Sequence, residues 1–101
     1  MAFVPVASLS DVPPGRSKEV MVDTERILVC NVGGTLYAVG DVCTHDNGPL
    51  GQGTLEGFEV ECPRHGARFD VKTGKALCLP AILPIPTYEV KVEGSQILVK
   101  R

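Results

Sequence analysis

Short apolar runs separated by turn residues recur along the whole chain. In Phe58–Glu61 and Tyr88–Val92, apolar and polar side chains alternate with the two-residue period of a strand that is buried on one face. Arg26–Val32 is apolar nearly throughout, which is typical of a fully buried strand. No segment of ten residues follows the 3.6-residue period of an amphipathic helix. The pattern therefore predicts an all-β fold.

Glycine and proline divide the predicted strands into short pieces. The chain has 11 Gly and 8 Pro, and the pair Gly33-Gly34 predicts a two-residue hairpin turn, because glycine accepts positive φ at both central positions. Leu77–Pro86 is expected to be an apolar, proline-rich loop. The expected strands are Ala2–Leu9, Glu19–Val22, Arg26–Val32, Thr35–Val39, Phe58–Glu61, Ala67–Val71, Tyr88–Val92 and Gln96–Val99.

The length of 101 residues suits a single domain, so we expect one domain over residues 1–101. From Asp41 onward the strands give way to a polar, glycine-rich stretch. We expect residues 41–70, approximately, to form an inserted unit. Residues 1–40 and 71–101 are then expected to form the base that carries it.

Charge and hydropathy argue against two classes of function. A formal charge of −2 and the lack of any Lys/Arg run argue against nucleic-acid binding. No segment reaches the ~18 consecutive apolar residues of a membrane helix, and the N-terminal residues lack the basic region of a signal peptide. We therefore expect a cytoplasmic protein with no membrane contact, in which two disulfides are the weaker use of four cysteines.

Both histidines of the chain lie within three positions of a cysteine. The two pairs are Cys43-Thr44-His45 and Cys62-Pro63-Arg64-His65, with sixteen residues between His45 and Cys62. Two thiolates and two imidazoles suit one tetrahedral zinc ion, or a [2Fe–2S] cluster with two Cys on one iron and two His on the other. The Cys-x-His spacing is tight for a single metal ion, so the spacing favours the cluster. Structural zinc is the alternative, and two unrelated pairs that fill turns are a weaker one.

The pattern C-x-H-x16-C-x2-H resembles the signature of the Rieske [2Fe–2S] family. Val39–His45 and Cys62–Asp70 are similar to the two ligand loops of Rieske ferredoxins and oxygenase Rieske domains, and the Pro80–Pro86 loop extends the match. The resemblance implies an all-β Rieske (ISP-type) fold. In that fold an antiparallel β-sandwich base carries an inserted cluster-binding subdomain, here about residues 41–70.

The same resemblance implies that Cys43 and Cys62 bind the buried iron of the cluster, and His45 and His65 the outer iron. The implied function is one-electron transfer by a soluble carrier, from a flavoprotein ferredoxin reductase to a terminal oxygenase or another acceptor. We expect a monomer that is not an enzyme on its own. Two alternatives are a Rieske-like small subunit of a nitrite reductase and a zinc-stabilised interaction module.

Four positions depart from the high-potential members of that family. Rieske proteins of cytochrome bc complexes carry an extra cysteine in each ligand loop, joined as a disulfide, where this chain has Gly48 and Arg64. They also carry a serine and a tyrosine, whose hydroxyls favour the reduced cluster, where this chain has Ala67 and Phe69. The resemblance therefore implies the low-potential, ferredoxin-like branch.

The remaining cysteines and charges have simpler interpretations. Cys30 lies in an apolar run and is expected to be a small core residue. Cys78, between two leucines, is also expected to be at least partly buried. Asp46, Arg64 and Arg68 are expected to be solvated charges.

Overall fold

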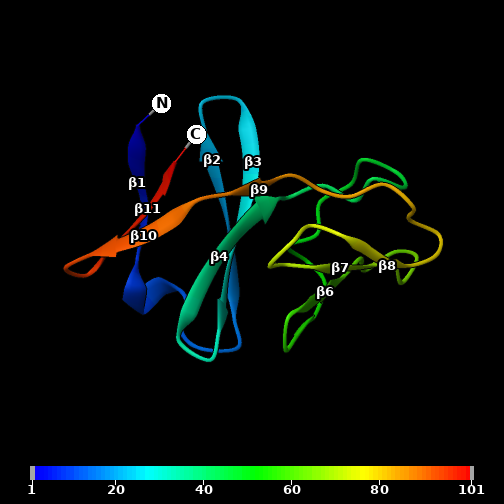
Figure 1. Ribbon diagram of the computed structural model, residues 1–101, viewed down its shortest axis with the longest axis horizontal. Coiled ribbons are helices and arrows are strands. Elements are labelled where there is room, and N and C mark those ends of the chain that lie inside the picture. The colour runs from blue at the N-terminus through cyan, green and yellow to red at the C-terminus, as the bar shows by residue number, and fades with distance from the viewer. Residues whose placement is uncertain (1, 101) are drawn as a thin grey trace.

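The structure is a computed structural model that describes residues 2–100, and its strands form three antiparallel sheets (Figure 1). The first sheet, in the order β1-β11-β10, consists of Phe3–Ser8, Gln96–Lys100 and Val90–Glu93. The second, β2-β3-β4-β9, consists of Ser17–Val22, Glu25–Val32, Thr35–Gly40 and Thr87–Tyr88. The third, β5-β6-β7-β8, consists of Leu55–Glu56, Glu59–Glu61, Arg68–Asp70 and Ala76–Cys78. Between residues 2 and 100 there is no α-helix, so the predicted all-β fold is confirmed.

The first two sheets pack against each other and form the base. Ile27 and Val29 of β3 meet Ile97 and Val99 of β11 in a core from which water is excluded, and Val12, after the 3-10 turn η1 (Leu9–Asp11), completes it. All five side chains are fully buried. Burial of such apolar side chains is the main favourable term that holds the two sheets together.

Strand β3 lies between two apolar cores, which explains why its sequence is apolar on both faces. Ile27 and Val29 point into the base core, whereas Leu28 and Cys30 point into a second core beneath the third sheet. Strand side chains alternate between faces, so each core receives every second residue. Figure 1 shows β6, β7 and β8 set beside β4 at the end of the molecule opposite β10.

The second core contains both cysteines of the predicted ligand set. Cys43 and Cys62 are buried there together with apolar residues from the base and from the third sheet. The other buried members are Leu28, Cys30, Val39, Leu50, Val60, Ala67, Phe69, Val71, Ala81 and Ile85. The third sheet and the base are thus joined by a continuous apolar contact.

Seven of the eight predicted strands are present, with ends that differ by a few residues, whereas the predicted strand Tyr88–Val92 is divided between β9 in the second sheet and β10 in the first. Gly33 and Gly34 have φ of 61° and 99°, as the predicted hairpin turn requires. Two strands were not predicted: β5, which has only two residues, and β8, which includes Leu77 and Cys78 of the predicted loop. Neither has enough residues to show a period along the sequence.

The division into a base and an inserted unit stays a proposal. Strand β8 ends at Cys78, so the third sheet extends beyond residue 70. The outer limits of the expected domain, Met1 and Arg101, lie outside the described residues. Across residues 2–100 no helix has the length and apolar character needed to cross a membrane.

Ile97→Ala is expected to lower the free energy of unfolding by about 2–5 kcal/mol, because the fully buried side chain leaves a cavity in the base core. Ile82→Ala is the matched control, since it removes the same atoms from a residue that is 77% exposed. We expect it to change the stability by less than about 0.5 kcal/mol. Urea unfolding followed by circular dichroism measures both, and equal losses would contradict the placement of Ile97.

Candidate metal centre

The first ligand loop is closed by backbone hydrogen bonds on its own cysteine. The N–H of Cys43 donates to the carbonyl oxygen of Gly48 at 2.7 Å, and the N–H of Asn47 donates to the carbonyl oxygen of Cys43 at 2.6 Å. Asn47 has φ of 62°, a left-handed conformation that asparagine tolerates better than most residues. The backbone of Cys43 is therefore fixed at both its donor and its acceptor.

The second ligand loop repeats the same pattern. The N–H of Cys62 donates to the carbonyl oxygen of Ala67 at 2.7 Å, and the N–H of Gly66 donates to the carbonyl oxygen of Cys62 at 3.1 Å. Gly66 has φ of 75° and corresponds to Asn47, four residues after the cysteine. Two loops far apart in the sequence thus present their cysteines in the same local frame.

The four candidate ligands separate into a buried pair and an exposed pair. Cys43 and Cys62 are at most 1% exposed, and their sulfur atoms lie within 4.8 Å of each other and of a carboxylate oxygen of Asp46. The rings of His45 and His65 are exposed, with centroids 4.8 Å apart and planes at 78°. Their nitrogens form a separate group that also includes Asp46.

This donor set fits two metal ions better than one. A single tetrahedral zinc requires all four ligand atoms at about 2.0–2.3 Å from one point, whereas here sulfurs and nitrogens gather in different groups. Burial raises the pKa of the Cys43 thiol, so two thiolates in this core need a positive charge beside them. An iron bound by both sulfurs supplies that charge, and a second iron suits the imidazole pair. The residues present therefore fit a [2Fe–2S] cluster held by Cys43, Cys62, His45 and His65.

Asp46 and Arg64 are exposed to solvent as expected, but they are paired with each other. Nε and Nη2 of Arg64 donate to the two carboxylate oxygens of Asp46 at 2.7 and 3.0 Å, and the N–H of Gly48 donates at 3.0 Å. These bonds, the one from Arg64 first, hold the pKa of Asp46 well below its usual range. Both oxygens are engaged, so Asp46 is not needed as a ligand, although one oxygen lies 3.6 Å from Nε2 of His65.

Arg68 is likewise paired rather than free. Its guanidinium contacts the carboxylates of three residues on β6, the adjacent strand, and on β5 beyond it, at 2.9 to 3.4 Å. These residues are Glu56, Glu59 and Glu61. Cross-strand ion pairs of this kind depend on strand register, which the sequence alone does not reveal.

The two remaining cysteines behave differently from each other. Cys30 is fully buried as expected, and burial raises the pKa of its thiol to about 12, which makes it an unreactive core residue. The expectation that Cys78 is at least partly buried is wrong. It is exposed because β8 lies at the edge of the third sheet, and its sulfur lies 3.5 Å from the carbonyl oxygen of Gly66.

Sequence reasoning missed the residues that support the first ligand loop. Asp41 is buried and accepts hydrogen bonds from the N–H groups of Leu50 and Gly51, at 2.8 and 2.9 Å. Arg26 donates to the carbonyl oxygen of Asn47 at 3.0 Å. The signal for Asp41 was present, since it is an acidic residue at the end of an apolar strand and two positions before Cys43.

A third loop lies against the first ligand loop. The hydroxyl of Thr44 donates to the carbonyl oxygen of Leu83 at 2.7 Å. This bond links the proline-rich segment after β8 to the residue next to His45. Three leucine and isoleucine side chains of the segment are more than half exposed: Leu79, Ile82 and Leu83.

The sequence of the chain is similar to those of known proteins. The family model described as the Rieske [2Fe–2S] domain matches residues 2–89. The ferredoxin component of biphenyl 2,3-dioxygenase from Rhodococcus jostii (strain RHA1) is 46% identical over 99 residues, which are 98% of this chain and 92% of that protein.

Solved structures give the same result. The ferredoxin of carbazole 1,9a-dioxygenase from Nocardioides aromaticivorans IC177 has a TM-score of 0.93 at 38% identity, over 98% of this chain and 97% of that one. A chain from a complex of reduced oxygenase and oxidised ferredoxin in carbazole 1,9a-dioxygenase has a TM-score of 0.90 at 37% identity, over 96% and 91%. By contrast, a structure described as an NADH-dependent nitrite reductase small subunit from Mycobacterium tuberculosis matches at 21% identity (TM-score 0.87, over 99% of this chain and 95% of that one), which shows the fold alone.

His45→Ala and His65→Ala are each expected to reduce the iron content from two per chain to a small fraction of that, because each removes a proposed ligand. Both side chains are exposed, so the apoprotein should still fold. Cys30→Ala and Cys78→Ala are the controls and are expected to keep the cluster. Iron and sulfide analysis with visible absorption measures all four, and cluster loss in either cysteine variant would contradict the ligand set.

Proposed function

Because the chain belongs to the Rieske [2Fe–2S] domain family, we propose that it is the ferredoxin component of an aromatic-ring dioxygenase system. In that role it carries single electrons to a terminal oxygenase and is not an enzyme on its own. The observation that carries the proposal is the division of the donors into buried thiols and exposed imidazoles. With these four residues as ligands, the imidazole side of the centre would lie within reach of a docked protein.

The chain's residues have distinct parts in this function. Cys43 and Cys62 are proposed to hold one iron in a core without water, and His45 and His65 to hold the other at the surface. A bound [2Fe–2S] cluster of this type accepts and releases one electron. Both ligand loops are fixed by backbone hydrogen bonds on their cysteines, so little rearrangement accompanies the change of charge.

The proposed docking face is the apolar segment beside His45. Leu79, Ile82 and Leu83 are 76%, 77% and 61% exposed, and Thr44 links Leu83 to the first ligand loop. Exposed apolar side chains next to a functional site are typical of a protein contact. The proposed occupant is the terminal oxygenase. A flavoprotein reductase is the proposed electron donor, and it would use the same face at a different time.

A cytoplasmic location and a monomeric state remain proposals. The four cysteines form no disulfide, which suits a reducing compartment. A monomer would leave the exposed imidazoles of His45 and His65 accessible to the reductase and the terminal oxygenase in turn.

The function predicts that product formation by a ring-hydroxylating terminal oxygenase, supplied with a ferredoxin reductase and NADH, depends on this protein. Stopped-flow absorption should show reduction of its cluster by the reductase and reoxidation by the oxygenase. A protein that is reduced but never reoxidised by any such oxygenase would contradict the proposal. The alternative role as a nitrite reductase subunit predicts instead stable association with a large catalytic chain.

Ile82→Ser is expected to lower kcat/KM for electron delivery about fivefold, because it removes about 1 kcal/mol of apolar contact from the proposed docking face. The cluster should load normally. Val92→Ser is the control, since Val92 is 43% exposed on β10, at the opposite end of the molecule (Figure 1). Equal kinetics for the two variants would show that the docking face lies elsewhere.

The midpoint potential is expected near the lower end of the range of roughly −150 to +300 mV that Rieske centres cover. Ala67 and Phe69 are fully buried and offer no hydroxyl donor. Ala67→Ser should raise the potential. The carbonyl oxygen of Ala67 accepts a hydrogen bond from the N–H of Cys62, so a hydroxyl at position 67 would lie close to the second ligand loop. Protein-film voltammetry measures this, with Ala76→Ser on β8 as the control. A positive midpoint for the wild type would contradict the low-potential assignment.

A further inference from the structure

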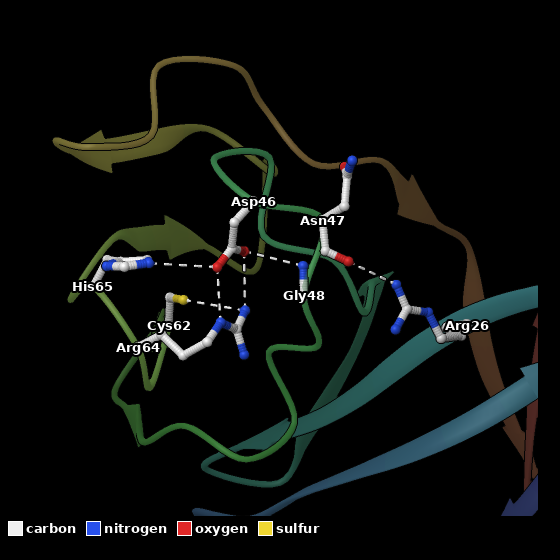
Figure 2. Close-up of polar contacts among 7 residues, drawn as sticks. All are labelled: Arg26, Asp46, Asn47, Gly48, Cys62, Arg64 and His65. Atoms are coloured by element: carbon white, nitrogen blue, oxygen red, sulfur yellow. Dashed lines mark hydrogen bonds and ion pairs between the residues drawn. The ribbon is translucent and has the colours of Figure 1, made fainter.

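Arg64 connects the two ligand loops through one side chain. It belongs to the second loop, directly before His65, and its guanidinium reaches Asp46 in the first loop, directly after His45 (Figure 2). Two N–H groups meet the two carboxylate oxygens, a bidentate geometry that fixes orientation as well as distance. The residues are eighteen positions apart in the chain, so the contact joins two loops that are distant in the sequence.

Gly48 makes room for this contact. A Cβ atom on Gly48 would overlap the guanidinium of Arg64, and Gly48 has no left-handed φ, so space rather than backbone conformation explains the glycine. The N–H of Gly48 also donates to Asp46, and its carbonyl oxygen accepts from Cys43. Arg64 therefore lies against the backbone that positions the first cysteine.

The guanidinium has a third contact, to a proposed ligand. Nη2 of Arg64 lies 3.7 Å from Sγ of Cys62, within hydrogen-bond range for sulfur (Figure 2). Hydrogen bonds to cluster sulfurs are among the factors that set the reduction potential. A positively charged donor stabilises the extra negative charge of the reduced state more than that of the oxidised state. Arg64 thus combines a mechanical contact between the loops with an electrostatic contact to the centre.

We propose that Arg64 and Asp46 are positioning residues for the cluster. Arg64 fixes the two ligand loops relative to each other and, by donating to Cys62, raises the reduction potential. Asp46 orients the guanidinium and offsets part of its charge. The proposal rests on the proposed ligand set, and it goes beyond that set because neither residue is a ligand.

The two residues predict shifts of opposite sign. Arg64→Met removes the donor and the positive charge and leaves Asp46 uncompensated, so the midpoint potential should fall. Asp46→Asn removes the negative charge and leaves Arg64 beside Cys62, so the potential should rise. An ion pair that only adds stability would shift neither potential, and a general loss of loop order would not give opposite signs.

The experiment compares the midpoint potentials of the loaded wild type and variants by protein-film voltammetry, with iron content and the EPR spectrum of the reduced cluster. Arg68→Met is the matched control. It makes the same substitution four residues further along the chain, at the start of β7, and gives the same formal charge of −3, one below that of the wild type. The ion-pair partners of Arg68 among the described residues are glutamates rather than residues of the ligand loops. Arg64→Lys keeps the charge without the bidentate geometry.

We expect Arg64→Met to reduce the equilibrium constant for cluster reduction at least threefold, which is about 28 mV at 59 mV per tenfold change for one electron. Asp46→Asn should increase it, Arg64→Lys should give an intermediate value, and Arg68→Met should leave it unchanged. If Arg64→Met binds no iron, Arg64→Lys takes its place, and its potential must still lie below that of the wild type.

Equal potentials for the wild type, Arg64→Met and Asp46→Asn would overturn the proposal. So would an Arg68→Met shift as large as that of Arg64→Met, since a general charge effect would then account for both. A wrong ligand set fails differently, because the cluster would then be kept in His45→Ala and His65→Ala, or lost in Cys30→Ala or Cys78→Ala.

Discussion

The burial of Cys43 and Cys62 in one apolar core is the constraint on which the site depends. Both thiols lie among side chains of the base and of the third sheet, so the sulfurs are kept from water while the imidazoles of His45 and His65 face it. This arrangement gives the centre an inner and an outer side. Without that core, the same four residues on flexible loops would bind metal ions in many geometries.

Several contacts around the two ligand loops support that placement. Asp41 holds the far end of the first loop by two backbone N–H groups, and Arg26 reaches it from β3. Gly53 allows close approach on the other side, because a Cβ there would overlap the carbonyl oxygen of Glu61. Thr44 joins the first loop to the proline-rich segment. These contacts come from residues widely separated in the chain. Loss of one contact should therefore leave the others, and the position of the ligand loops, in place.

Features encoded by neighbouring residues could be predicted from the sequence, whereas features that depend on contacts between distant segments could not. Most strands were found from alternating or continuously apolar runs, and the ligand pairs from their close spacing. The two-residue strand β5 and the edge strand β8 exist through pairing with neighbours, so the exposure of Cys78 was not foreseen. The same holds for Asp46 and Arg64. Each looked like an ordinary surface charge, because nothing local shows that the two loops bring them together.

The alternation along β3 has a consequence for how such a domain can change over time. Ile27 and Val29 serve only the base core, and Leu28 and Cys30 serve only the core below the metal centre. Adjacent positions in one strand are therefore under separate packing requirements. Substitutions at even-numbered positions can adapt the metal-bearing half while the odd-numbered positions keep the scaffold intact. A single strand thus allows the two halves of a small domain to diverge at different rates without losing their attachment.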